Sequence, residues 1–133
     1  MKTGIITGTG KGIGLSTLKT LLKNKYKVIS ITKSKTKELD TLLKNKNLIK
    51  NIYHPLGEDL LSDKNLVNEI YKEYKIDFMV CNAGVRHRDS IQEMNLEKRK
   101  YTLNVNYHSN VILIEELLKF FKKKKTSLSI VCI

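Results

Sequence analysis

The chain has 133 residues, of which 41% are hydrophobic and 29% charged, and its formal net charge is +12. This length and composition are typical of one soluble globular domain and exclude a second core. The apolar stretches, such as residues 111–114, are too short to span a bilayer, and the opening Met1-Lys2-Thr3 leaves no room for a secretory signal. We therefore expect a cytoplasmic protein with no membrane partner.

The positive charge comes almost entirely from lysine. Arginine occurs only at Arg86, Arg88 and Arg99, so the other 22 of the 25 basic residues are lysines. Recognition of phosphates and base edges favours arginine forks, whereas the lysine run at 122–125 is typical of a solvated helix C-terminus. A basic nucleic-acid-binding domain is therefore only a remote alternative.

The cysteines and histidines indicate no special chemistry. Cys81 and Cys132 each lie in an apolar run, which predicts small buried thiols rather than a disulfide. The three histidines are scattered without the spacing of metal ligands. We expect no metal site.

Strands and helices are expected to alternate along the chain. The first half predicts a strand at 2–7, a helix at 12–24, a strand at 27–32, a short helix at 36–44 and a strand at 48–53. The second half predicts a helix that Ser62 can cap, a buried strand at 76–81, a long helical tract from about 95 to 124 and a strand at 128–133. This order implies a parallel sheet with right-handed crossovers, which binds ligands at the carboxyl ends of its strands.

The segment Thr7 to Gly14, which reads TGTGKGIG, joins the first strand to the first helix. Its glycines Gly8, Gly12 and Gly14 permit a tight turn, a close approach of a ligand to the backbone, and close packing of the helix on the strand. The helix that begins there directs free N–H groups and its positive dipole end at an anion. The turn therefore predicts a pyrophosphate site, the alternative being a glycine-rich turn without a ligand.

The tip of the second strand indicates which dinucleotide binds. It reads Thr32-Lys33-Ser34-Lys35 and holds no carboxylate, which an NAD site uses to bind the ribose 2′-OH. Lys11 in the glycine turn adds a second cation that can reach a 2′-phosphate. NADP is therefore favoured over NAD, unless these lysines only reflect the lysine-rich composition.

Three segments together resemble the classical short-chain dehydrogenase/reductases: Thr7-Gly8-x-x-x-Gly12-x-Gly14, Cys81-Asn82-Ala83-Gly84, and Asp59 after the third strand. The resemblance covers essentially the whole chain. It implies a Rossmann-type, doubly wound parallel sheet with helices on both faces, truncated after the fifth strand. Residues 1–133 would then form an incomplete NAD(P)-binding domain.

The resemblance assigns roles to individual residues. It implies that Asp59 bonds the adenine amino group, whereas Lys11 and Lys33 are expected at the 2′-phosphate from their own positions in the sequence. The pyrophosphate would lie against Gly8, Gly12, Ile13 and Gly14, and the adenine ribose side would be lined by Asn82, Ala83 and Gly84.

One catalytic residue is implied in the long helical tract. The stretch Leu103 to Tyr107 is similar to the family's segment with a catalytic asparagine, and Asn106 fits better than Asn104. Such an asparagine would hold a water of a proton relay through its backbone carbonyl. The alternative is an asparagine on a helix surface.

Two departures from the family pattern affect the expected activity. Cys81 replaces an asparagine, and the chain stops at Ile133, before the family's catalytic Ser and Tyr-x-x-x-Lys. Tyr71 and Lys75 match that last spacing by count, but they precede Asn82 and are treated as chance. We expect an N-terminal portion of an enzyme, inactive by itself.

The resemblance implies an NADP-preferring oxidoreductase that transfers a hydride between its cofactor and a carbonyl or alcohol. The full-length form would be a homo-oligomer with a small-molecule substrate. A non-catalytic NADP-binding module, acting as a sensor or partner protein, is the alternative.

Overall fold

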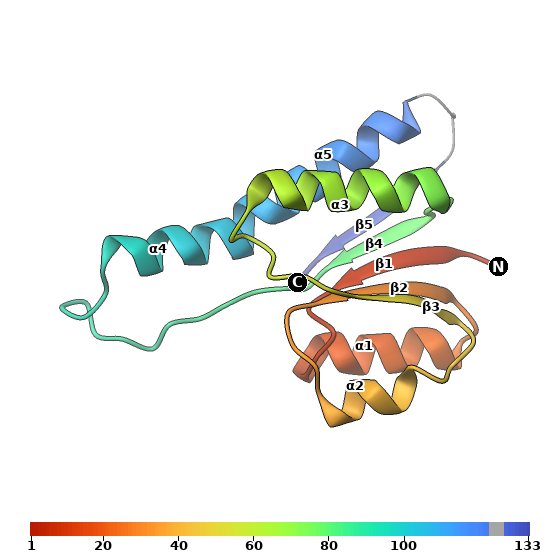
Figure 1. The fold of residues 1–133 in the computed structure, drawn as a ribbon, viewed down its shortest axis with the longest axis horizontal. Coiled ribbons are helices and arrows are strands. Elements are labelled where there is room, and N and C mark those ends of the chain that lie inside the picture. The colour runs from red at the N-terminus through yellow and green to blue at the C-terminus, as the bar shows by residue number, and fades with distance from the viewer. Residues whose placement is uncertain (123–126) are drawn as a thin grey trace.

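The computed structural model describes residues 1–122 and 127–133. In these ranges a five-stranded parallel sheet has the order β3-β2-β1-β4-β5 (Figure 1). The strands are β1 (Thr3–Thr7), β2 (Lys27–Thr32), β3 (Leu48–Tyr53), β4 (Phe78–Cys81) and β5 (Ser129–Cys132). The order reverses between β1 and β4, which is where a doubly wound sheet binds its ligand.

Helices cover both faces of the sheet, as expected. Figure 1 shows α1 (Gly12–Lys23) and α2 (Lys37–Leu42) on one face, and α3 (Leu60–Glu73) and α5 (Ser109–Phe121) on the other. The helix α4 (Leu96–Leu103) extends beyond the sheet, and a π-helical turn (Asn104–His108) joins it to α5. The Rossmann-type prediction is confirmed.

Two hydrophobic clusters hold the layers together, one on each face of the sheet. Ile5 of β1 contacts the cluster that includes Val67 of α3 and Leu113 of α5. Its neighbour Ile6 contacts the other cluster with Leu18 of α1. Successive side chains of a strand point to opposite faces, so a strand covered on both sides is apolar throughout. Each such side chain contributes about 1.5–3 kcal/mol when fully buried.

Two details of the helices differ from the sequence prediction. Asp59, not Ser62, caps α3, because its carboxylate accepts hydrogen bonds from the backbone N–H groups of Leu61 and Ser62. The tract predicted from about 95 to 124 is not one α-helix, since the π turn interrupts it, and α5 ends at Phe121. Of the lysine run, Lys122 follows α5 and the remainder lies outside the described residues.

The prediction of a buried thiol is confirmed at Cys81 and wrong at Cys132. Cys132 is exposed, although the two residues are paired across β4 and β5. The reason is that β5 is an edge strand, where the neighbouring Val131 is also 53% exposed.

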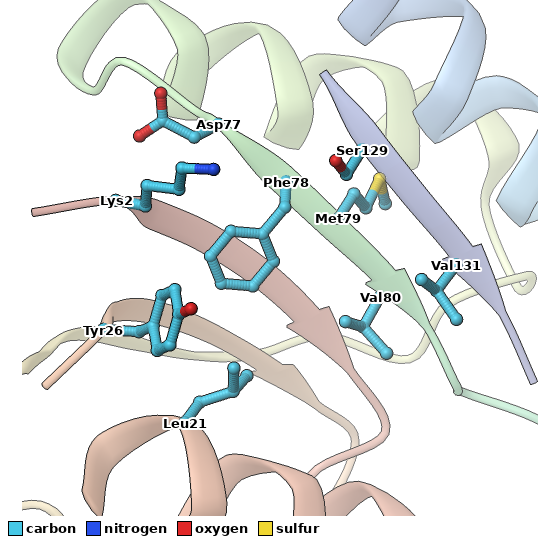
Figure 2. A pocket seen from close by; sticks show the side chains of 9 residues that line it. All are labelled: Lys2, Leu21, Tyr26, Asp77, Phe78, Met79, Val80, Ser129 and Val131. Carbon is cyan, nitrogen blue, oxygen red and sulfur yellow. The ribbon is translucent and has the colours of Figure 1, made fainter. Parts of the chain in front are cut away.

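A groove runs over β4 and β5 on the face that carries α1 (Figure 2). Its volume is about 260 Å³, and its apolar wall includes Phe78, Val80 and Val131. Lys2 and Asp77 line it at the start of β1 and β4, so it opens near the amino ends of the strands, away from the glycine turn.

In residues 1–122 and 127–133, no helix is both long and apolar enough to cross a membrane.

Candidate dinucleotide site

The glycine turn between β1 and α1 has the geometry of a ligand cradle. Gly8 and Gly12 have positive φ angles of +73° and +57°, which other residues adopt at a cost. A Cβ atom on Gly14 would overlap the carbonyl oxygen of Gly8, so the helix packs directly on the turn. A Cβ atom on Gly12 would meet nothing within 4 Å, so the turn is open there.

The N-terminus of α1 also fits an anion. Lys11 stands at the N-cap position, and its side chain makes no capping hydrogen bond. The first backbone N–H groups of a helix lack partners within the helix, and they favour a negative group in front of them. Together with the open face at Gly12, this donor set fits a pyrophosphate.

The segment after β4 binds the glycine turn from one side. The Thr7 hydroxyl oxygen accepts hydrogen bonds from the backbone N–H groups of Asn82 (3.0 Å) and Ala83 (2.9 Å). The Asn82 side-chain amide donates to the carbonyl oxygens of Thr7 (3.3 Å) and Gly8 (3.1 Å). Asn82 thus supplies donors to the backbone carbonyl groups at the start of the turn.

Two hydroxyl groups bind the turn from the β2 side. Thr9 and Ser30 share a buried hydrogen bond of 2.6 Å between their hydroxyl oxygens. The Thr36 hydroxyl caps α2 at Leu39 and also donates to the Gly10 carbonyl at 2.9 Å. The turn is therefore held on both sides before any ligand arrives.

Of the two candidate asparagines, Asn106 lies against the segment that follows β4. Its side chain accepts from the Val85 N–H at 2.7 Å and donates to the Val85 carbonyl at 2.9 Å. The Gly84 backbone approaches the same amide. The backbone carbonyl of Asn106 accepts a hydrogen bond from the Asn110 side chain at 3.0 Å, whereas the carbonyl of Asn104 accepts from the Ser109 N–H inside the π turn.

Lys33 lies at the tip of β2, as predicted, but with partners that sequence reasoning missed. Its Nζ donates to the Tyr101 hydroxyl at 3.1 Å and lies 3.4 Å from a Glu58 carboxylate oxygen. The hydrogen bond with Tyr101 and then that with Glu58 raise the pKa of Lys33. These partners lie 68 and 25 residues away along the chain, so no local pattern could have indicated them. Lys11 is exposed at the glycine turn.

Asp59 has its carboxylate directed at its own helix. Besides the two backbone bonds of the cap, it accepts a hydrogen bond from the Ser62 hydroxyl at 2.6 Å. The Ser62 hydroxyl and backbone bonds lower the pKa of Asp59. A contact with adenine stays a prediction for this residue, now with the capping role beside it.

A buried carboxylate that the sequence analysis did not single out lies behind the site. Asp63 is fully buried, and its Oδ2 accepts from the Ser109 hydroxyl (2.6 Å) and the Gly57 N–H (3.2 Å). Its Oδ1 lies 3.3 Å from Nδ1 of His54. The available signal was its place on the buried face of α3, four residues before Val67.

Tyr71 and the polar loop after Gly84 take no part in the cradle. The Tyr71 ring is buried, and it packs on Phe120 with ring centroids 5.2 Å apart. Burial raises the pKa of Tyr71, which makes it a poor proton donor. In the loop, Asp89 forms an ion pair with Lys98 at 2.8 Å.

Nowhere in the described part of the chain do three or more His, Cys, Asp or Glu residues gather as a metal-binding group.

Comparison with known proteins decides the family. A family model described as short chain dehydrogenase matches residues 2–133. The chain belongs to the short-chain dehydrogenase family. The resemblance inferred from the glycine turn and from Cys81-Asn82-Ala83-Gly84 is thereby confirmed.

Curated short-chain dehydrogenase relatives match nearly the whole chain. An uncharacterised oxidoreductase of Schizosaccharomyces pombe is 31% identical over 96% of this chain and 51% of its own length. A 3-oxoacyl-(acyl-carrier-protein) reductase of Rickettsia prowazekii is 31% identical over 93% of this chain and 50% of its own length. The chain therefore spans about half the length of the curated relatives it matches.

Solved short-chain dehydrogenases have the same fold. A structure from Beutenbergia cavernae, described as an NAD(P)-dependent gluconate 5-dehydrogenase with bound NADP, has a TM-score of 0.85 at 21% identity and covers 98% of this chain and 53% of its own. ElxO with NADPH bound has a TM-score of 0.81 at 26% identity and covers 98% and 54%. A 4-hydroxyisoleucine dehydrogenase with NADH has a TM-score of 0.82 at 23% identity and covers 99% and 55%.

Proposed function

We propose that the chain supplies the dinucleotide-binding part of an NADP-preferring oxidoreductase. The whole protein would transfer a hydride between the nicotinamide and a carbonyl or alcohol substrate. The observation that carries the proposal is the open glycine turn at the uncapped start of α1, bonded to Asn82 and Ala83. The reductases and dehydrogenases among its relatives support this activity.

When bound, the cofactor supplies the hydride, and the residues of this chain position it. The backbone of Gly8, Gly12, Ile13 and Gly14 would hold the pyrophosphate, with Asn82, Ala83 and Gly84 beside the adenine ribose. The close packing of Gly14 on Gly8 brings the N-terminus of α1 up to the turn, so that its N–H groups face the anion.

Asn106 is proposed as the catalytic asparagine. Its side chain is fixed by the two bonds to Val85, so its backbone carbonyl has a defined direction. Asn110 uses one acceptor position of that carbonyl. A carbonyl oxygen can accept two hydrogen bonds, so the water of a proton relay would share this carbonyl with the Asn110 side chain.

We assign the preference for NADP to Lys33 and Lys11, the two lysines expected to meet the 2′-phosphate. No carboxylate lies within the tip of β2 itself, and Lys33 presents an ammonium group there with its side chain 58% exposed. Lys11 can approach the same phosphate from the glycine turn. The NADP and NADPH named for two structural neighbours support this cofactor.

Lys33→Ala tests the assignment. We expect it to lower the affinity for NADP by about tenfold and to leave that for NAD nearly unchanged, because only NADP has the 2′-phosphate. Calorimetric titration of both dinucleotides measures the ratio of NADP to NAD affinity. Lys50→Ala is the control, because Lys50 pairs with Glu73 away from the turn. An unchanged ratio would contradict the role of Lys33.

Catalysis by the 133 residues alone is not expected, because no Tyr-x-x-x-Lys follows β5. Cofactor binding without oxidation of NADPH on a panel of aldehydes and ketones would agree with this. Turnover by the chain alone would refute it and would require another proton donor.

The full-length protein is proposed to be a homo-oligomer that uses the exposed face of α4 and the π turn. Leu96 and Leu103, seven residues apart, are more than half exposed, and Tyr107 follows four residues later. Apolar residues at this spacing form one stripe, and a second copy of the helix can cover it. Light scattering measures the oligomeric state.

A further inference from the structure

Lys33, the residue assigned to the 2′-phosphate, already has an anionic partner. The Glu58 carboxylate lies 3.4 Å from its Nζ, and the Tyr101 ring centroid lies 5.4 Å from it. The ammonium group is thus between a carboxylate from the β3–α3 loop and a phenol from α4. Any phosphate that binds Lys33 meets Glu58 there.

We propose that Glu58 is a specificity-determining residue that competes with the 2′-phosphate of NADP for Lys33. The inference rests on the proposed NADP site. A 2′-phosphate carries close to two negative charges at pH 7, so it is repelled by Glu58 and must displace it from the lysine. The ribose 2′-OH of NAD is neutral and can donate a hydrogen bond to the same carboxylate.

The backbone around Glu58 is fixed by hydrogen bonds, so its side chain always extends from the same point. The Gly57 N–H donates to buried Asp63, and the Glu58 N–H donates to the Pro55 carbonyl at 3.2 Å. The next residue, Asp59, caps α3. Only the Glu58 side chain, which is 50% exposed, is free to turn away when a phosphate arrives.

Tyr101 holds Lys33 in place during this exchange. Its hydroxyl oxygen accepts the hydrogen bond from Lys33, which leaves the hydroxyl proton free to be donated to a phosphate oxygen. A phenol hydroxyl can donate to a phosphate oxygen as well as accept from the lysine, so it opposes neither dinucleotide. The competition therefore depends on the charge of Glu58.

Glu58→Gln keeps the size of the side chain and removes its charge. We expect the ratio of NADP to NAD affinity to rise about three- to tenfold, a modest change because Lys33 and Glu58 are both exposed to solvent. Calorimetric titration of NADP and of NAD gives the ratio without any turnover. Glu73→Gln is the matched control, because it removes one charge from another exposed Lys–Glu pair, that with Lys50.

The double variant separates this inference from the proposed function. With Lys33→Ala in the background, Glu58→Gln should raise the ratio less than it does in the native protein, because the part of its effect that comes from competition for Lys33 is lost. If Lys33→Ala lowers the ratio and Glu58→Gln alone does not raise it above the Glu73→Gln control, Glu58 plays no such role and the proposed NADP site stands. If Lys33→Ala leaves the ratio unchanged, or neither dinucleotide binds, both proposals fail.

Discussion

Asp63 places a buried carboxylate between three segments that are distant in the sequence. It accepts hydrogen bonds from Ser109 at the start of α5 and from Gly57 in the β3–α3 loop, and it lies beside His54 at the end of β3. A buried polar group is tolerated when hydrogen bonds satisfy it. The residue thus couples the loop that carries Glu58 to the helix that follows Asn106.

Removing this carboxylate should destabilise the fold. Asp63→Ala leaves the Ser109 hydroxyl and the Gly57 N–H buried without an acceptor, and we expect the free energy of unfolding to fall by about 3 kcal/mol. Urea unfolding followed by circular dichroism measures the loss. Asp89→Ala, which removes a partly exposed carboxylate together with its ion pair to Lys98, is the control. Equal stability of the two variants would show that the buried hydrogen bonds contribute nothing.

Individual residues were predicted from the sequence only where their role depends on near neighbours. The glycines of the turn are identified by local spacing, and their positive φ angles at Gly8 and Gly12 agree with the interpretation. The partners of Lys33 and the donors around Asp63 depend on which segments the fold brings together. No pattern within one segment contains that information.

The π turn between α4 and α5 and the β3–α3 loop are packed against each other. Gly57 has a φ of +89°, and a Cβ atom on it would lie 2.6 Å from the Val105 backbone nitrogen. Such close approach of two backbones requires glycine. The loop therefore fixes the position of the turn from which Asn106 reaches Val85.

Two glycine variants should separate packing from binding. Gly57→Ala combines a strained φ with a backbone clash, so we expect a loss of about 3 kcal/mol in unfolding free energy. Gly12→Ala also has a positive φ but meets no atom within 4 Å, so it should cost less stability and mainly weaken dinucleotide binding. Thermal unfolding and calorimetric titration of both variants measure these effects. The opposite pattern would overturn the assignment of the open face to the cofactor.

Elements were predicted well where hydrophobic periodicity defines them, and less well at their ends. The strands and helices occur in the predicted order, because apolar patterns reflect burial on each face. The cap of α3 was misplaced because Asp59 and Ser62 are both good capping residues, and only the backbone decides between them. A π turn has no periodicity of its own at five residues, so it could not be seen in the sequence.

Across the whole molecule, a parallel sheet with helices on both faces follows from the alternation of strands and helices, and the structure agrees with it. The exposure of side chains in an edge strand depends on which other segments cover that strand. The sequence of the strand does not contain this information. This explains why Cys81 and Cys132, both within apolar runs, differ in the structure. Cys81 lies in β4, between β1 and β5, whereas Cys132 lies in the edge strand.

The two thiols should therefore react differently. Burial raises the pKa of the Cys81 thiol to about 12, so at pH 8 it holds almost no reactive thiolate. We expect a thiol reagent such as Ellman's reagent to modify one cysteine rapidly in the native protein and both in denaturant, with Cys132→Ser abolishing the fast reaction. Rapid native labelling of Cys132→Ser would show that β4 is not protected in solution.

The backbone between Asn82 and Val85 connects two parts of the site. Its first residue is bonded to the glycine turn, and its last is bonded to the side chain of Asn106. The length of these four residues therefore sets the distance between the place proposed for the pyrophosphate and the place proposed for the relay carbonyl. A change in the length of this segment would alter the reach between the two, whereas a change of its side chains would leave that reach intact.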